Sequence, residues 1–440
     1  MAKTIELKIR YVPVGTLKPY QNNARTHSKK QISQIAASIR RFGMVTPILV
    51  DGDGTIIAGH GKFMAAIECG LPDVPAVRVD HMTEADRKAY VIADNRLAEL
   101  SGWDDDILRI EFQNIESLVA DYPLEITGFD TGRIDLITGD PISKIDPADE
   151  VPENEEVVVT RQGDLWVLGD HRLICGDAQE TAVYARLMGD ERARMSFVDP
   201  PYNVPIEGHV SGLGAKTHRE FVMAAGELDE DEFVDLLASA MTQVADYSIN
   251  GSIHFWAMDW RHLDELSLAR KRARLEMKNL IVWNKTNAGM GAFYRSQHEL
   301  FYVLKKGNEK HTNNFGLGES GRYRTNVWNY AGANTFKRDR AEELDWHPTV
   351  KPTVLVVDAI RDVSKRGDIV IDCFAGSGTT AIAAEKTKRK ARLIELDPRY
   401  CDTIIRRFMT YTGKSVRHAD TGLDFDDLSQ QRVQEIAPAG

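Results

Sequence analysis

The sequence has few cysteines and no long hydrophobic run. Its four cysteines lie far apart among 440 residues and form no CxxC pair, which argues against a disulfide framework and against a zinc site. No stretch of about eighteen or more apolar residues occurs, and residues 1–30 hold no uninterrupted apolar segment of signal-peptide length. These absences predict a cytoplasmic protein with reduced thiols, no metal and no membrane partner.

An excess of positive charge is also missing, since the net charge is −11. The acids are concentrated, however: residues 100–158 contain three Lys/Arg and sixteen Asp/Glu, whereas residues 1–41 contain nine Lys/Arg and one acid. Further basic clusters occupy residues 261–285 and 305–340. Because charge is distributed so unevenly, the total does not exclude a nucleic-acid partner.

Residues 1–100 show the pattern of a compact α/β unit. Apolar residues recur at helical spacing from residue 32 to residue 42, and Gly43 follows as a helix end. Two short strands flank the DGDG turn, and a helix after them is ended by Gly70. The segment VPAVRV predicts another strand, and Thr83 is placed to begin a further helix.

The remaining chain divides by composition. Residues 101–156 are rich in acids, proline and glycine, which predicts an acidic connecting segment. From residue 157 to residue 415, apolar strand candidates alternate with helical patterns, which indicates a second and larger α/β domain. Residues 416–440 are expected to form a polar tail.

The segment MSFVDPPYNV, residues 195–204, begins as a strand and breaks into an acid, two prolines and an aromatic residue. Ligands of open α/β sheets lie beyond the carboxyl ends of strands. Pro200 and Pro201 stiffen this loop and offer carbonyls without N–H donors. The Asp199 carboxylate and the Pro200 carbonyl could draw the exocyclic amine of a base toward a pyramidal geometry, with Tyr202 stacked on the ring. The alternative is a plain Pro-Pro turn.

The segment GDIVIDCFAGSGTTAIAAE, residues 367–385, predicts a strand, a tight turn and a helix. Gly376 and Gly378 let the backbone approach a ligand. Glu395, after the next strand, lies nineteen residues beyond Gly376, a spacing that suits an acid holding ribose hydroxyls. The third glycine of a dinucleotide fingerprint is absent, so a nucleoside cofactor without a pyrophosphate, S-adenosylmethionine, fits better than NAD.

Together, these two segments resemble the amino-methyltransferases of DNA. The stretch DPPY, residues 199–202, resembles the catalytic motif of that family, and DCFAGSG, residues 372–378, resembles its cofactor motif. The catalytic motif comes first in the chain, an order similar to the β class. The resemblance covers residues 157–415, including HPTVKP at 347–352, and it implies a Rossmann-like α/β methyltransferase domain that uses S-adenosylmethionine.

The resemblance also assigns residues of the site. It implies that the catalytic residues are Asp199, Pro200, Pro201 and Tyr202. It implies that the cofactor is bound by Asp177, Thr349, Lys351, Asp372, Phe374, Gly376, Gly378 and Glu395. For the segment around Lys351, an ordinary turn with a solvated lysine is the alternative.

Residues 305–345 lie where this family keeps its target-recognition region, and they interleave basic and aromatic side chains. Cations can neutralise phosphates, and aromatic rings can stack on bases. The predicted DNA-contacting residues are Arg322, Arg324, Lys337 and Arg338. The partner implied is double-stranded DNA, from which the target base must be flipped into the pocket. A solvated surface loop is the alternative.

The N-terminal unit resembles the ParB-like partition domain through IIAGHGKFMAA, residues 56–66. Partition proteins usually carry an arginine in this loop, whereas this chain has His60, Gly61 and Lys62. Gly59, Gly61 and Lys62 stand at a predicted strand-to-helix turn, which makes them a candidate anion site. A capped turn with an exposed lysine is the alternative.

These observations predict a site-specific DNA methyltransferase that acts on adenine N6. Methylation of cytosine N4 uses similar chemistry and is the first alternative. Methylation of RNA or of a protein amide is a second, because a related motif serves those acceptors. A partition-like DNA-binding regulator with an inactive transferase half is a third alternative, from a different class. The oligomeric state is left open, a homodimer included.

Overall fold

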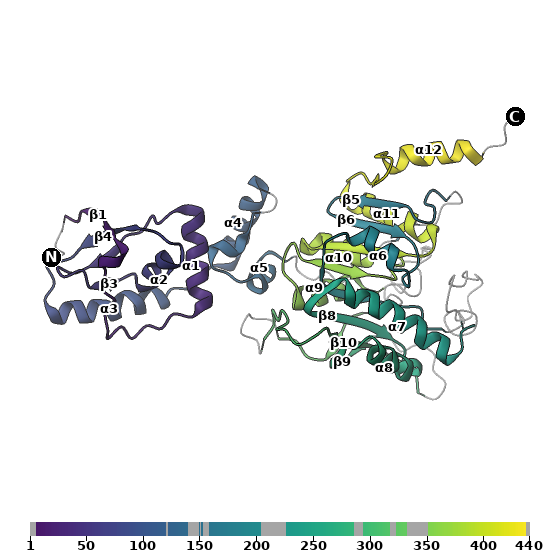
Figure 1. The fold of residues 1–440 in the computed structure, drawn as a ribbon, viewed down its shortest axis with the longest axis horizontal. Coiled ribbons are helices and arrows are strands. Elements are labelled where there is room, and N and C mark those ends of the chain that lie inside the picture. Colours follow the sequence, from purple (N-terminus) through teal and green to yellow (C-terminus); the bar gives the residue numbers. More distant parts are fainter. Residues whose placement is uncertain are drawn as a thin grey trace. The chain divides into compact units, whose positions relative to one another are not determined.

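The computed structural model describes residues 6–119, 122–139, 149, 151–152, 158–203, 226–285, 294–316, 323–331 and 351–436. The chain divides into two compact units, Met1–Gly139 and Asp140–Gly440 (Figure 1). In the part of the chain that the structure describes, no helix is both long enough and apolar enough to cross a membrane.

The first unit contains a mixed sheet of strand order β1-β4-β2-β3, in which β4 runs antiparallel to β1 and parallel to β2. Its helices begin and end where the sequence predicted: the Thr83 side chain caps α3, and Gly43 ends α1 with a φ of +77°. The elements are β1 (Ile9–Pro13), η1 (Val14–Thr16), α1 (Lys29–Phe42), β2 (Ile48–Val50), β3 (Ile56–Ala58), α2 (His60–Glu68), β4 (Asp73–Arg78) and α3 (Glu84–Glu99).

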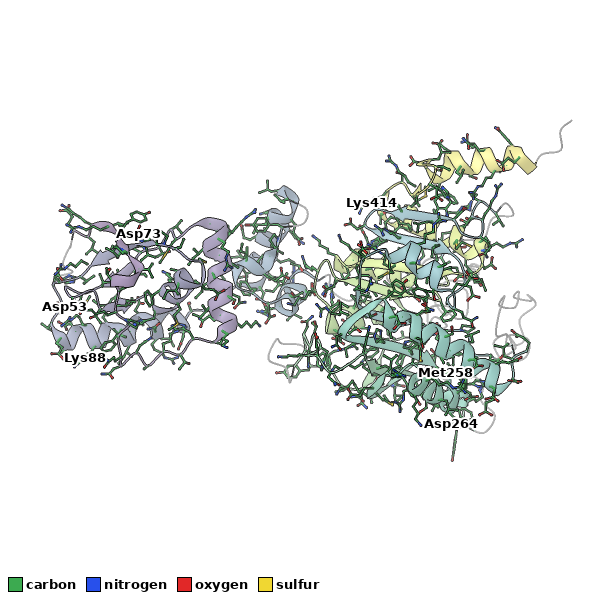
Figure 2. The ribbon with its side chains drawn as sticks, in the orientation of Figure 1. Asp53, Asp73, Lys88, Met258, Asp264 and Lys414 are labelled. Carbon is green, nitrogen blue, oxygen red and sulfur yellow. The ribbon has the colours of Figure 1, made fainter. Side chains whose placement is uncertain are left out.

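Charged side chains lie on the surface of this unit (Figure 2). Lys88 and Glu84 form an ion pair of 2.6 Å across one turn of α3, and both side chains are more than half exposed. Exposed pairs of this kind contribute little to stability, because water and salt screen their charges. The unit therefore depends on its apolar core, in which Ile48, Ile56 and Val74 are buried.

The expected acidic connecting segment, residues 101–156, contains helices packed around a small core of its own. The elements are α4 (Asp105–Leu118), η2 (Leu124–Thr127) and α5 (Thr131–Thr138). Phe112, Leu124 and Ile134 are buried between them. Several of the acids act at helix starts, where Asp104 caps α4 and Asp130 caps α5. Each of these acids favours the start of a helix. Together, however, they raise the acid content of the stretch, and this is why its composition indicated a connector.

The second unit is built on one large sheet, which within the described residues has ten strands in the order β11-β9-β10-β8-β7-β12-β13-β6-β5-β14. The five strands from β8 to β6 in this order run parallel, so their carboxyl ends meet at one edge. The strands are β5 (Leu165–Leu168), β6 (His171–Cys175), β7 (Ala193–Val198), β8 (Ser248–Met258), β9 (Glu276–Asn284), β10 (His298–Lys305), β11 (Val327–Asn329), β12 (Ile369–Asp372), β13 (Lys390–Glu395) and β14 (Arg417–His418).

Helices flank both faces of this sheet (Figure 1). Neighbouring strand residues alternate between the faces: Trp256 packs with the core that includes α6, α7 and α8, whereas Phe255 packs with the core that includes α9. This doubly covered sheet confirms the predicted Rossmann-like α/β class. The helices are α6 (Thr181–Met188), α7 (Glu230–Asp246), η4 (Trp260–His262), α8 (Leu263–Arg272), α9 (Thr353–Val363), α10 (Thr379–Thr387), α11 (Pro398–Thr412) and α12 (Phe425–Ile436).

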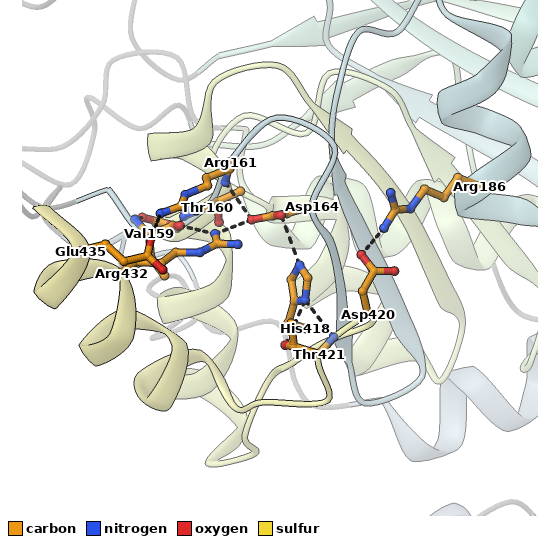
Figure 3. Close-up of polar contacts among 11 residues, drawn as sticks. Val159, Thr160, Arg161, Asp164, Arg186, His418, Asp420, Thr421, Arg432 and Glu435 are labelled. Atoms are coloured by element: carbon orange, nitrogen blue, oxygen red, sulfur yellow. Dashed lines mark hydrogen bonds and ion pairs between the residues drawn. The ribbon is translucent and has the colours of Figure 1, made fainter.

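The C-terminal residues differ from the expected polar tail of residues 416–440. β14 adds to the edge of the sheet beside β5, and α12 follows it. Phe425 is buried at the start of α12, with its ring edge-on to Trp166. Figure 3 shows the polar contacts, in which the Asp164 carboxylate lies between His418 (3.2 Å) and Arg432 (2.5 Å). Long-range contacts of this kind leave no periodic signal in so polar a stretch.

Replacing Arg432 by alanine is expected to destabilise the second unit by about 1 to 3 kcal/mol, because the buried Val159 carbonyl and Asp164 carboxylate both lose a donor. Urea unfolding followed by tryptophan fluorescence measures the loss. Arg161→Ala is the matched control: Arg161 also pairs with an acid of α12, Glu435, but both side chains are more than half exposed, so the loss of stability should be much smaller than for Arg432→Ala. Equal effects of the two substitutions would contradict a stabilising role for the buried contact.

Candidate active site

Three acids stand at the carboxyl edge of the parallel strands. Asp199 directly follows β7, Asp372 is the last residue of β12, and Glu395 is the last residue of β13. β12 lies between β7 and β13 in the sheet. The structure therefore brings the DPPY segment and the glycine-rich segment to adjacent strand ends, although they are far apart in the sequence.

The loop after β7 is held by its own side chains. The Tyr202 hydroxyl donates a hydrogen bond to Oδ1 of Asp199 (2.8 Å). The Asn203 amide donates to the Leu228 carbonyl (2.8 Å), and its oxygen accepts from the Gly226 N–H (3.0 Å). Together, these bonds fix the loop against the residues that lead into α7.

Lys351 lies against the same loop. Its ammonium donates to Oδ2 of Asp199 at 2.6 Å and lies 3.0 Å from Oε2 of Glu299. Glu299, near the start of β10, also pairs with Lys285, the residue directly after β9. Sequence reasoning missed Glu299, although a carboxylate at the start of the apolar run HELFYVL was a usable signal. Lys351 was expected with the cofactor-binding residues, and the structure places its ammonium beside the DPPY loop, next to Asp199 and Tyr202.

The two carboxylates beside Lys351 respond differently to burial. Burial raises the pKa of Asp199, and the Lys351 ammonium opposes this rise. Burial also acts to raise the pKa of Glu299, but Lys351 and Lys285 outweigh it and bring that pKa to about 2. Burial alone would lower the pKa of Lys351, yet the two carboxylates raise it. Glu299 is therefore a fixed anion, and Asp199 is the carboxylate that accepts a proton more readily.

The glycine-rich loop lies between β12 and α10. Gly378 begins α10 with a φ of +81°, and a Cβ there would stand 2.9 Å from Ile404, so glycine is required on both grounds. Asp372 accepts from the Thr380 hydroxyl (2.6 Å) and from the Phe374 N–H (3.2 Å). The Phe374 side chain is partly buried in the core beside the loop.

Glu395 is tied to this loop. Its carboxylate accepts from the N–H groups of Gly376 (2.8 Å) and Asp397 (2.9 Å). Burial raises the pKa of Glu395 to about 7, and it raises the pKa of Asp372 to about 7 as well. The pair offers acceptor oxygens at two neighbouring strand ends. Each carboxylate oxygen has a second lone pair, so both side chains can still accept bonds from ligand hydroxyls.

The other residues assigned to the cofactor are distributed as follows. Asp177 comes shortly after β6, the strand beside β13, and its carboxylate accepts from the Gln179 N–H at 2.8 Å. Thr349 lies outside the described residues. Asp177 is therefore at the same edge of the sheet as Glu395.

The predicted DNA-contacting residues are largely outside the described part of the chain, since Arg322, Lys337 and Arg338 all fall there. Arg324 is described, and 16% of its side chain is exposed. It donates to Asp362 (2.9 Å) and to the Tyr330 hydroxyl (2.8 Å). In this arrangement Arg324 ties the segment around β11 to α9.

The candidate anion site of the first unit forms the turn into α2. Gly59 caps α2 with a φ of +98°, and Gly61 is packed so closely that a Cβ would lie 3.1 Å from His27. Burial lowers the pKa of Lys62, and Asp94 opposes this shift. The His60 ring nitrogen Nε2 accepts from the Tyr20 N–H at 3.3 Å. The structure thus brings Gly59, Gly61 and Lys62 together at one helix start.

Comparison with protein families gives three matches. Residues 193–406 match a DNA methylase family of the N6/N4 type, and residues 2–95 match the ParB N-terminal domain. Residues 106–162 match the ParB-methyltransferase HTH domain. This last match covers most of the stretch that composition suggested to be a connector; it includes α5 and all but the first residue of α4.

Relatives cover both parts of the chain. The ParB-like nuclease domain-containing protein YnaK of Escherichia coli K12 is 43% identical over 83 residues, which are 19% of this chain and 95% of YnaK. The type II methyltransferase M2.DpnII of Streptococcus pneumoniae is 25% identical over 240 residues, 50% of this chain and 84% of that protein. Among solved structures, the M1.HpyAVI–SAM complex is 20% identical, with a TM-score of 0.39, and the match covers 53% of this chain and 97% of that one.

The methylase match includes the DPPY loop, the glycine-rich loop and Glu395, the segments that meet at the carboxyl edge of the sheet. Methylases of this type take their methyl group from S-adenosylmethionine, and the ParB-like parts add DNA-binding domains ahead of the methylase domain. The chain belongs to the N6/N4 DNA methylase family and carries a ParB N-terminal domain and a ParB-methyltransferase HTH domain.

Proposed function

We propose that this protein methylates adenine N6 at a specific site in double-stranded DNA. The observation that carries the proposal is the position of Asp199 and Tyr202 at the end of β7, beside the strand whose end bears Asp372 and the glycine-rich loop. A flipped base and a methyl donor bound at these neighbouring strand ends would meet at one point of the sheet edge.

The residues at the ends of β12 and β13 fit S-adenosylmethionine. Among the residues that the structure describes, a Cβ added at Gly376 would meet only the Phe374 carbonyl, at 4.0 Å, which leaves room there for a ligand against the loop. The Glu395 carboxylate is placed to accept bonds from the ribose hydroxyls, and Asp372 with Asp177 adds acceptors on either side of it. Phe374 offers an aromatic surface for the adenine ring. When bound there, S-adenosylmethionine supplies a methyl group on a sulfonium.

The DPPY loop would activate the amine. Asp199 and the Pro200 carbonyl accept the two amine hydrogens and draw the nitrogen lone pair out of conjugation, while the Tyr202 ring stacks on the base. The lone pair then forms the N–C bond as the C–S bond breaks, and the electron pair of that bond stays on sulfur. The methylated amine releases one proton, which Asp199 accepts. Its raised pKa suits this step, because a carboxylate of higher pKa is a stronger base.

The test is to incubate the protein with methyl-labelled S-adenosylmethionine and unmodified duplex DNA, then digest the DNA and identify the labelled nucleoside by mass. We expect N6-methyladenine, with less label in the same DNA offered as single strands. Detection of N4-methylcytosine would support the same reaction, with cytosine in place of adenine as the target base. Labelled RNA or protein in parallel reactions, with unlabelled DNA, would contradict a DNA substrate.

A further inference from the structure

Lys351 and Asp199 present a hydrogen-bond donor beside a hydrogen-bond acceptor at the catalytic loop. The Lys351 ammonium is 2.6 Å from Oδ2 of Asp199 and 3.4 Å from the Tyr202 hydroxyl. Only 7% of the Lys351 side chain is exposed. An ammonium has three donors and no acceptor, so this lysine can recognise only an atom with a free lone pair.

The bases differ in the atom next to their amine. In adenine and in cytosine, the exocyclic amine lies beside a ring nitrogen that has a lone pair, N1 or N3. In guanine, the ring nitrogen next to the amine on the Watson–Crick edge, N1, carries a hydrogen, and thymine has no amine. A donor beside an acceptor in the protein is therefore complementary to the Watson–Crick edge that adenine and cytosine share, and it is not complementary to the Watson–Crick edge of guanine or thymine.

The surroundings of Lys351 would keep it in place when a base arrives. Oε2 of Glu299 is 3.0 Å from the Lys351 ammonium, and Glu299 is itself held by Lys285. The Trp283 ring lies beside both lysines, with its centroid 6.0 Å from the Lys351 nitrogen and 4.8 Å from that of Lys285. When the base amine donates its hydrogen bond to Asp199, Glu299 still holds Lys351. The N–H of Lys351 that pointed to Asp199 is then free to donate to the ring nitrogen of the base.

We propose that Lys351 is a specificity-determining residue: it donates a hydrogen bond to the ring nitrogen next to the reactive amine, and Glu299 is the positioning residue that holds it there. This inference rests on the proposed function and deepens it, because it states which edge of the base the pocket reads. It assigns Lys351 to the base, whereas the family resemblance alone grouped it with the cofactor-binding residues.

The test uses a change of one atom in the base. The target site is first mapped by sequencing DNA that the protein has methylated. Duplexes are then made with 1-deazaadenine at the target position, or 3-deazacytosine if cytosine is the target. Each keeps the amine and replaces the ring nitrogen by CH. We expect the unaltered protein to lose about 10- to 100-fold in kcat/KM on the deaza base.

Two variants of the protein are compared on the natural base and the deaza base. Lys351→Met keeps the length of the side chain and removes the donor, so it should be slower on the natural base, and the deaza base should slow it by a smaller factor than it slows the unaltered protein. Lys285→Met also removes a cation beside Glu299, but not the one that contacts Asp199, and it should keep most of the discrimination. Effects of the deaza base on stacking or on the amine itself occur in every variant and cancel in this comparison.

The outcomes separate the inference from the function on which it rests. Equal methylation of natural and deaza bases by the unaltered protein would overturn the role of Lys351 while leaving the methyltransferase in place, and this result does not depend on any variant folding. If Lys351→Met still discriminates fully between the natural and the deaza base and binds S-adenosylmethionine more weakly, then Lys351 contacts the cofactor and not the base. If no methylated site is found in DNA at all, the proposed function fails and the inference fails with it.

Discussion

Replacing Asp199 by asparagine should reduce the rate constant of methyl transfer by about a thousandfold, while S-adenosylmethionine still binds. The amide keeps the shape of the carboxylate but removes the charge that polarises the amine and the base that takes its proton. It also removes the anion that faces Lys351 at 2.6 Å. Single-turnover transfer to duplex DNA measures the rate, and calorimetry measures cofactor affinity.

Asp420→Asn is the matched control, because it removes a carboxylate that is 62% exposed and pairs only with a surface arginine among the contacts described. It should leave both the rate and the affinity unchanged. Transfer by Asp199→Asn at more than a tenth of the normal rate would remove Asp199 from the chemistry. Loss of cofactor binding in the same variant would mean that Asp199 acts on the cofactor side of the pocket.

Replacing Glu395 by alanine should weaken the binding of S-adenosylmethionine by about 1 to 3 kcal/mol, or roughly 5- to 150-fold in Kd. The acceptor for the ribose hydroxyls is lost, and the Gly376 N–H loses its partner, so the glycine-rich loop is less well fixed. Calorimetric titration measures the effect. Glu435→Ala, which removes an exposed carboxylate of α12, is the control and should bind the cofactor normally.

The pH dependence of binding provides a second measurement. Burial raises the pKa of Glu395 to about 7, so in the free protein this carboxyl is largely protonated at pH 6 and ionised at pH 8. Ribose hydroxyls donate to the ionised form, so affinity should increase from pH 6 to pH 8 and binding should release protons. Alanine at this position should reduce the slope. An unchanged Kd and slope in Glu395→Ala would reject the role of Glu395.

Sequence patterns predicted the features of the structure that depend on residues close together in the chain. The strand, glycine turn and helix of residues 367–385 appear as β12, the loop and α10, because tight turns and helix starts depend on neighbours in the chain. The adjacency of Asp199, Asp372 and Glu395 was also predictable in outline, since parallel strands place their carboxyl ends together.

Contacts across the sheet were not predictable in the same way. Glu299 and Lys351 meet because β10 lies beside β8, near β7, and this strand order is set by the packing of the whole sheet. The helices of residues 105–138 were hidden by their acidic caps, and the burial of Phe425 depends on Trp166, far earlier in the chain. In such cases a single residue of the sequence does not reveal the contact, because its partner lies far away in the chain.

The pairing of β7 with β12 also determines when a newly made chain acquires activity. Met195 pairs with Val370, and the chain between them forms β8 to β11 and α7 to α9. During synthesis the ParB N-terminal domain can fold first, as N-terminal domains generally do. The central strand β12 and the glycine-rich loop after it arrive only after most of the sheet has been translated, and closing so long a loop is slow. A nascent chain therefore completes its ParB N-terminal domain before β7 and β12 can pair, and a chain terminated before β12 would lack Asp372 and the glycine-rich loop.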